Sequence, residues 1–195
     1  MARTQGSRAE ITGPALRDAA LRLFARHGYA AVSMRQLAGE VGVQAGALYA
    51  YTPDKQALLA DLLRGHMEEL LAEWSDDAAA PALDRLERFV AFHVRFSLEH
   101  RDAVFLSYME LRNLAPENHA AIARLRRAYE DALQAILDAG CAAGVMHLPD
   151  TRVAAMALIA MLTGVTHWYR EGGRYDRPGI EAIYLDLVLG AVGAA

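Results

Sequence analysis

The sequence has almost none of the features that mark secreted or membrane-spanning proteins. It holds a single cysteine, Cys141, set among small residues, so no internal disulfide can form and a buried thiol in a reducing compartment is indicated. Its most apolar run, 153–165, is shorter than the about 20 residues that a bilayer-spanning helix needs. The N-terminus is polar and carries Arg3 and Arg8, unlike a signal peptide. We therefore expect a cytoplasmic protein with no membrane partner.

Residues that interrupt helices or favour strands are also scarce. The 195 residues include six prolines and no stretch rich in β-branched side chains, whereas hydrophobic residues, many of them Ala and Leu, make up 54%. This composition is typical of helical proteins. We therefore predict an all-α fold.

Positive charge is in deficit over the whole chain, whose net charge is −4. The deficit is uneven, however. Residues 1–64 contain eight Lys and Arg against five Asp and Glu, a net charge of +3, and the remainder contains twelve against nineteen, a net charge of −7. This asymmetry predicts a phosphate-seeking surface at the N-terminus and a solvated acidic surface elsewhere.

Residue patterns that carry out catalysis or bind metals are missing as well. Seven His are present, but none forms an i, i+4 pair with an acidic or thiol partner on one helix, and one Cys cannot build a thiolate site. The sequence contains no nucleophile elbow and no phosphate-binding glycine loop. We predict no catalytic residue, no metal and no cofactor. A helical hydrolase or transferase with a basic N-terminal patch is the alternative from a different class.

The most informative stretch runs from Ser33 to Lys55. Ser33 can cap a helix whose apolar side chains share one face, and Gly42 ends that helix where a left-handed residue is needed. A second short helix is predicted over 44–51, with Leu48 and Tyr51 facing inward. Two short helices joined by a glycine-containing turn form a helix-turn-helix, whose second helix fits the major groove of DNA.

The residues after this motif predict the start of another helix. Thr52 is expected to cap it, with Pro53 in its first turn. Lys55 then lies at the N-terminal end, where amide groups and an ammonium together can bind a phosphate.

This part of the chain resembles the N-terminal domain of the TetR family of transcriptional regulators. The matching positions are Phe24, Gly28, Tyr29, Ser33, Leu37, Ala38, Gly42, Val43, Leu48, Tyr49, Tyr51, Lys55, Leu58 and Leu59. Two residues depart from the pattern: the family usually has an aromatic residue in place of Thr52 and often a Lys or Arg in place of Ala45. The resemblance implies a regulator that binds operator DNA as a homodimer.

The expected DNA contacts follow from the motif and the resemblance. The segment Gln44–Ala47 has small, nearly uncharged side chains. Its one amide, Gln44, is expected to pair with adenine, and its methyl groups are expected to contact thymine. The full predicted set is Ser33, Arg35, Gln44, Ala45, Gly46, Ala47, Tyr49, Ala50, Tyr51 and Lys55. Arg3 and Arg8 belong either to a minor-groove arm or to a disordered start.

The rest of the chain is predicted to consist of further helices. A first helix should begin at Thr12, with Pro14 in its first turn. A helix over 53–74 should join two domains, which we place at residues 1–64 for DNA binding and 65–195 for ligand binding and dimerisation. Beyond the acidic linker 75–81, helices are expected over 81–100, 102–114, 117–143, 153–169 and 180–192. The last two are apolar on more than one face, which predicts a homodimer interface.

The C-terminal domain is expected to hold a mostly apolar pocket with a few polar anchors. The residues predicted to line it are Phe89, Phe92, His93, Phe96, Phe105, Tyr108, Met109, Arg112, Arg124, Tyr129, Met161, His167 and Trp168. The segment 167–173, with the helix 184–190, is similar to TetR regulators of fatty-acid, sterol and aromatic-acid breakdown, some of which respond to acyl-CoA thioesters. That similarity implies an acyl chain beside the phenylalanines and phosphates on Arg124, Arg126 and Arg127; a different apolar inducer fits the same residues.

These observations predict a ligand-responsive repressor. It would bind a palindromic operator as a homodimer and be released when an apolar effector shifts the 53–74 helix. A constitutive DNA-binding regulator without a ligand is the alternative within the same class.

Overall fold

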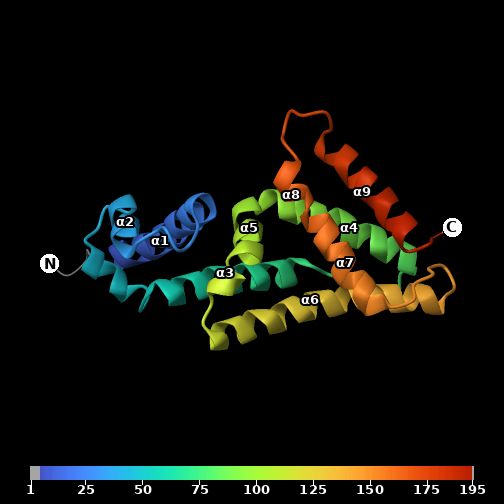
Figure 1. Ribbon diagram of the computed structural model, residues 1–195, viewed down its shortest axis with the longest axis horizontal. Coiled ribbons are helices and arrows are strands. Elements are labelled where there is room, and N and C mark those ends of the chain that lie inside the picture. The colour runs from blue at the N-terminus through green and yellow to red at the C-terminus, as the bar shows by residue number, and fades with distance from the viewer. Residues whose placement is uncertain (1–4, 195) are drawn as a thin grey trace. The chain divides into compact units, whose positions relative to one another are not determined.

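The computed structural model describes the backbone of residues 5–194 and the side chains of residues 12–194 (Figure 1). Over this range the chain is helical and contains no strand, as the composition predicts. The elements are α1 (Gln5–His27), α2 (Met34–Glu40), η1 (Ala45–Ala50), α3 (Lys55–Glu73), α4 (Ala82–Glu99), α5 (Arg101–Met109), η2 (Leu111–Asn113), α6 (Pro116–Ala142), α7 (Thr151–Thr163), α8 (Val165–Trp168) and α9 (Arg177–Ala191). No helix in the described part of the chain has the length and apolar character needed to cross a membrane.

The chain divides into two compact units. Unit 1 comprises residues 1–67 and 102–123, and unit 2 comprises residues 68–101 and 124–195. Unit 1 therefore holds the helix-turn-helix together with α5, η2 and the first turns of α6. Unit 2 holds α4, most of α6 and the helices α7, α8 and α9.

The first helix begins earlier than the sequence predicts. Helix α1 starts at Gln5, so Thr12 lies inside it instead of capping it, and Pro14 lies in its interior. The prediction is wrong because Pro14 suits a first turn, whereas the residues before it, Arg8-Ala9-Glu10, have good helix propensity and extend the helix back to Gln5. Arg3 lies outside the described residues, and the side chain of Arg8 lies outside them too.

The helix-turn-helix forms as its sequence predicts. Ser33 caps α2 in a capping box: its Oγ accepts from the Gln36 amide at 3.2 Å, and the Gln36 side chain accepts from the Ser33 amide at 2.8 Å. Gly42 has a φ of +70°, and the amides of Gly42 and Val43 donate to the carbonyls of Gly39 and Ala38 at 3.3 and 2.9 Å. These paired bonds form a Schellman motif, which ends α2. The chain then enters η1 (Ala45–Ala50), which we call the reading segment because it takes the place of the DNA-recognition helix.

The cap of α3 differs from the prediction. The side chain of Asp54 accepts from the Ala57 amide at 2.7 Å, so Asp54 caps the helix. The Thr52 hydroxyl instead donates to the Asp54 carbonyl at 2.9 Å and is buried. A charged carboxylate is favoured near the positive end of the helix dipole, which explains why Asp54 takes this position.

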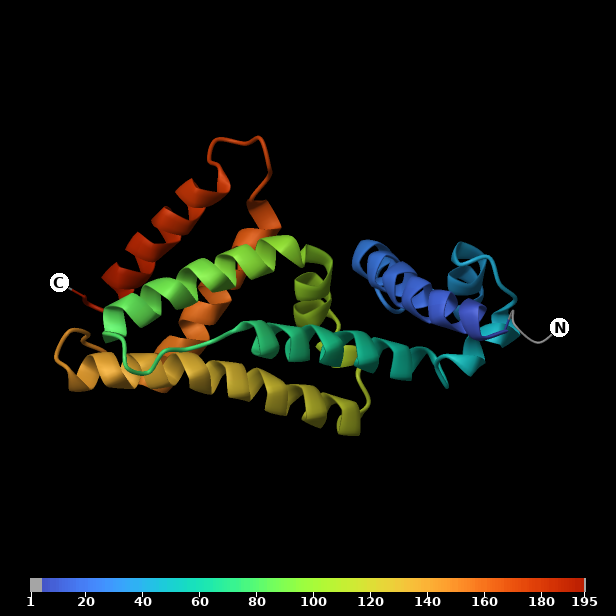
Figure 2. The same cartoon turned by 180° about the vertical axis from the view of Figure 1, so that it is seen from behind.

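Unit 2 is built around α4. This helix packs against α7, α8 and α9, and both views show α9 running beside it (Figures 1 and 2). Asp150 caps α7 and Asp176 caps α9, each accepting from the amide three residues on at 2.9 Å. The buried guanidinium of Arg85 holds the Asp76 carboxylate, with 3.0 Å from Nε to Oδ1, and lowers the pKa of Asp76. This ion pair fastens the acidic linker to α4.

Candidate functional site

The reading segment η1 presents an exposed surface over a buried anchor. Leu48 is 0% exposed, whereas Gln44, Gly46, Ala47 and Ala50 are exposed and Tyr49 is 57% exposed. Ser33 and Arg35 are also exposed, and Ala45 is half-buried. The residues predicted to contact bases therefore lie at the surface of unit 1, held in place by one leucine.

Two details of this segment differ from the prediction. The segment is a 3₁₀ helix, Ala45–Ala50, with the Ala47 amide donating to the Gln44 carbonyl at 2.9 Å. Tyr51 does not face inward with Leu48, since it is 36% exposed. The tighter 3₁₀ winding of about three residues per turn puts Leu48 and Tyr51 in register along the helix but leaves Tyr51 at its end, where only one side is covered.

Lys55 is held by two backbone carbonyls. Its Nζ donates to the oxygens of Tyr29 at 2.8 Å and Val32 at 2.7 Å, and it lies 4.2 Å from the centroid of the Tyr29 ring. Burial lowers the pKa of Lys55, and the negative charge of Glu110 opposes this. An ammonium has three N–H donors, so the third is the one that the predicted phosphate contact would use. The phosphate contact of Lys55 stays a prediction. The structure shows in addition that Lys55 joins the start of α3 to the Tyr29–Val32 turn.

Residues far apart in sequence join the helix-turn-helix to α5 and α6 within unit 1. The buried Glu110 carboxylate accepts from the Tyr29 amide at 3.1 Å. The Gln56 amide nitrogen donates to the Asn113 carbonyl at 2.6 Å, and its oxygen accepts from the Ala115 amide at 2.9 Å. Sequence spacing gave no signal of these contacts, because the partners lie 57 to 81 residues apart.

The aromatic residues predicted to line a ligand pocket form a packed core in unit 2. Phe89, Phe92 and Phe96 are buried, and Trp74 lies 5.0 Å from Phe89 and 5.3 Å from Phe92 between ring centroids. His93 is buried between the Tyr129 hydroxyl and the Thr163 hydroxyl, each 3.0 Å from one of its ring nitrogens. His93 and Tyr129 therefore belong to a hydrogen-bonded core.

The other predicted ligand residues do not gather in one place. Phe105, Tyr108, Met109 and Arg112 belong to unit 1, where Phe105 is half-buried and the other three are exposed. In unit 2, Met161 is half-buried, whereas Arg124, His167 and Trp168 are exposed. The predicted ligand residues are thus divided between two units, and none of them lines either of the two pockets described below.

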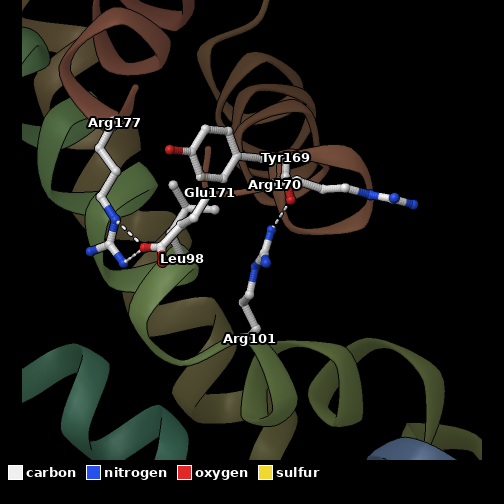
Figure 3. Close-up of a pocket in the computed structure, with 6 residues that line it drawn as sticks. All are labelled: Leu98, Arg101, Tyr169, Arg170, Glu171 and Arg177. Atoms are coloured by element: carbon white, nitrogen blue, oxygen red, sulfur yellow. Dashed lines mark hydrogen bonds and ion pairs between the residues drawn. The ribbon is translucent and has the colours of Figure 1, made fainter. Parts of the chain in front are cut away.

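Unit 2 contains a pocket that the sequence does not predict. It has a volume of about 310 Å³ and is lined by Leu98, Arg101, Tyr169, Arg170, Glu171 and Arg177, which we call the arginine pocket (Figure 3). A second pocket of about 330 Å³ lies in unit 1 and is lined by Gly13, Pro14, Leu16, Arg17, Tyr51, Thr52, Leu58 and Asp61. Arg101 is 69 residues before Arg170 and 76 residues before Arg177, so only the fold brings it to the other two.

Apolar side chains remain exposed on the last helices. Val153 and Met156 of α7 are exposed, as are Ile183 and Leu187 of α9, and Leu187 is 52% exposed. Tyr184 and Val188, which alternate with them, are buried. Each helix therefore buries one apolar face in unit 2 and leaves a second one uncovered, as the sequence predicts.

Three potential metal ligands lie close together in unit 2. Oxygen atoms of Glu69 and Glu73 and a ring nitrogen of His100 lie within 4.8 Å of one another. The two carboxylates are exposed. His100 Nδ1 is 3.7 Å from a carboxylate oxygen of Glu69, and the His100 ring stacks on the Phe96 ring with 4.2 Å between centroids. Glu69 and Glu73 lie on α3 and His100 follows α4, so spacing along a single helix does not predict this grouping. The contact with Glu69 and the stack on Phe96 account for the position of the His100 ring.

The fold of unit 1 and its exposed reading segment define a DNA-binding protein of the helix-turn-helix class. A family model described as "Bacterial regulatory proteins, tetR family" matches residues 16–62, and one described as "Tetracyclin repressor-like, C-terminal domain" matches residues 79–192. The second model alone covers more than half of the chain. The protein belongs to the TetR family of transcriptional regulators, which confirms the resemblance seen in the sequence.

Individual relatives match along nearly the whole chain. The HTH-type transcriptional repressor KstR2 of Mycobacterium tuberculosis is 29% identical over 184 residues, which is 91% of this chain and 90% of the relative. The crystal structure of a TetR-family regulatory protein from Rhodococcus RHA1 has a TM-score of 0.89 at 31% identity and covers 95% of this chain and 98% of that one. The structure of AibR in complex with isovaleryl coenzyme A and operator DNA has a TM-score of 0.80 at 20% identity, with coverage of 94% and 100%.

Proposed function

We propose that this protein is a cytoplasmic, ligand-responsive repressor that binds a palindromic operator as a homodimer and is released by an acyl-CoA thioester. The observation that carries the DNA-binding part is the exposed segment 44–51, held by the buried Leu48 after a tight Gly42 turn. Such a segment fits the major groove and leaves its side chains free for base edges. Repression is favoured by the relative KstR2, which is described as a repressor.

The homodimer is supported by the uncovered apolar faces of α7 and α9. A helix-turn-helix dimer contacts two half-sites one helical turn apart, roughly 34–36 Å. Pairing α7 and α9 of one protomer with those of its partner would cover Val153, Met156, Ile183 and Leu187 in a four-helix interface. The symmetry of the resulting dimer requires a palindromic operator.

The effector class is supported by a relative and by charge. AibR was solved with isovaleryl coenzyme A and operator DNA. Unit 2 of the present chain contains a pocket with three arginines, which suit phosphates. A constitutive regulator without a ligand is the second candidate, and it is favoured by the dense packing of the Phe89–Phe92–His93 core.

Base recognition by Gln44 can be measured directly. We expect Gln44→Ala to cost about 1–3 kcal/mol at one operator position, because a bidentate amide contact to adenine is lost. Non-specific affinity should not change, since phosphate contacts supply most of it. A fluorescence-anisotropy scan of single base-pair substitutions in the operator provides the test. Undiminished discrimination at all positions would remove Gln44 from base recognition.

Release by acyl-CoA can be tested by titration of the operator complex. Medium- or long-chain acyl-CoA at micromolar concentration should release the operator, as followed by anisotropy or gel shift. Free coenzyme A and the matching free acid should each be much weaker, because each offers only the charged or only the apolar part. If no thioester of any chain length releases the DNA, the constitutive regulator becomes the better account.

A further inference from the structure

The side chains that line the arginine pocket carry more positive than negative charge, which favours binding of an anion. Arg101 begins α5, Arg170 lies between α8 and α9, and Arg177 begins α9. Figure 3 shows Arg101 reaching the Tyr169 carbonyl, Glu171 lying against Arg177, and Arg170 extending away from that pair at the edge of the pocket. The pocket therefore has three guanidinium groups and a single carboxylate on its lining.

The three arginines are not equally neutralised. The Glu171 carboxylate accepts from Arg177 Nε at 3.1 Å, and Glu99 lies 3.5 Å from the same guanidinium. Among the side chains of residues 12–194, no carboxylate forms an ion pair with Arg101 or Arg170. Arg177 thus faces two carboxylates, whereas Arg101 and Arg170 face none, and the three arginines together keep one excess positive charge.

Arg101 also has an unused buried donor. Its Nη2 donates to the Tyr169 carbonyl, whereas its Nε is buried and has no acceptor in the described structure. A buried N–H without an acceptor is costly, and a guanidinium can hold phosphate or carboxylate oxygens with two donors at once. An anion bound beside Arg101 would supply the missing acceptor.

The volume of the pocket limits how much of a ligand it can hold. At about 310 Å³ it lies at the lower end of the range of roughly 300–1,000 Å³ seen for small-molecule sites. It suits a phosphate or diphosphate group with little attached, and an acyl chain would have to lie outside it. Arg124 and Arg127 of α6, which the sequence analysis favoured, are exposed and line neither of the two described pockets.

We propose that the arginine pocket binds the phosphate group of an anionic effector, with Arg101 and Arg170 as its principal ligands and Glu171 as an internal competitor. This inference rests on the proposed function, in which such an effector releases the operator. Glu171 is 68% exposed in its side chain, so it can leave Arg177. Arg177 then keeps only the Glu99 contact at 3.5 Å and can turn a donor toward the incoming phosphate.

The test uses isothermal titration calorimetry of the full-length dimer with coenzyme A and with inorganic pyrophosphate at fixed ionic strength. Arg101→Gln and Arg170→Gln should each weaken coenzyme A binding about tenfold or more, because a hydrogen bond to a charged group is lost. Glu171→Gln should tighten it severalfold, since the competing charge is removed. The matched control, Arg124→Gln with Arg127→Gln, should leave it unchanged. Arg170 is exposed, so its variant tests the pocket even if Arg101→Gln perturbs folding.

The outcomes separate this inference from the proposed function. Operator release by acyl-CoA at the same concentration in wild type and Arg170→Gln would overturn the pocket and leave the function standing. Arg170-dependent binding of coenzyme A without operator release by any thioester would support the pocket and contradict the function. No binding of either coenzyme A or pyrophosphate to the wild type at millimolar concentration, or binding of both that Arg101→Gln and Arg170→Gln leave unchanged, would overturn the pocket as an anion site.

Discussion

Replacing Leu187 by glutamate is expected to produce monomers that keep their helices and lose operator binding. Leu187 and Ile183 lie on the exposed face of α9, and in the proposed dimer both are covered by the partner. A carboxylate at that position would be buried without a counter-charge, which costs several kcal/mol. Because each half-site then binds alone, operator affinity should fall by at least two orders of magnitude. Sedimentation velocity and circular dichroism measure the two properties separately.

A matched control distinguishes the interface from a general effect of added charge. Ala135 is exposed on α6, and Ala135→Glu should leave both the dimer and the operator affinity unchanged. Ile183→Glu should reproduce the Leu187→Glu result. If monomers appear only together with loss of helicity, the side chain belongs to the internal core of unit 2 and the proposed interface is wrong.

Local features of the fold were predictable because they depend on neighbouring residues. Ser33 and Gln36 make a capping box within four residues, and the Gly42 turn needs a positive φ that glycine adopts without strain. Periodicity places the helices after residue 80, but the segments expected as single helices over 102–114 and 153–169 are each divided in two, and α7 and α9 begin earlier than expected, at the caps Asp150 and Asp176. These signals act over a few residues, so a single sequence contains them.

The errors arose where several local signals compete. Pro14 suits the first turn of a helix, but the helix-forming residues before it extend α1 back to Gln5. Thr52 and Asp54 can both cap α3, and the carboxylate prevails beside the helix dipole. Pro14 therefore lies inside α1 and not in its first turn, and Asp54, not Thr52, is the cap of α3.

The candidate ligand site was the part least accessible from sequence. Aromatic residues at helical spacing predict that a face is buried, but not whether it packs or lines a cavity. Phe89 and Phe92 pack against Trp74, whereas the pocket combines Arg101 with two arginines from a segment about 70 residues further on. The contact of Glu110 with Tyr29 is equally long-range. Such convergence depends on tertiary packing, which periodicity does not encode.

Lys55→Met should reveal two separate roles of one side chain. The substitution keeps most of the side-chain length, removes the ammonium and leaves the carbonyls of Tyr29 and Val32 without their charged donor. Loss of hydrogen bonds from a charged group costs about 1.5–3 kcal/mol. The free energy of unfolding, measured in urea, should fall by about that amount. The matched control is Arg64→Met on the same helix, where the side chain is exposed and the change should stay within about 0.5 kcal/mol.

The second role concerns DNA and is measured at temperatures where Lys55→Met remains folded. The third N–H of Lys55 is predicted to contact a phosphate, so the slope of log affinity against log salt concentration should decrease by about one in magnitude, for any duplex. Loss of stability with an unchanged slope would make Lys55 a tie between α3 and the Tyr29–Val32 turn alone. A smaller slope with unchanged stability would mean that water replaces the ammonium on both carbonyls. Because stability and salt dependence are measured independently, the structural role of Lys55 and its phosphate contact can each be confirmed or rejected without the other.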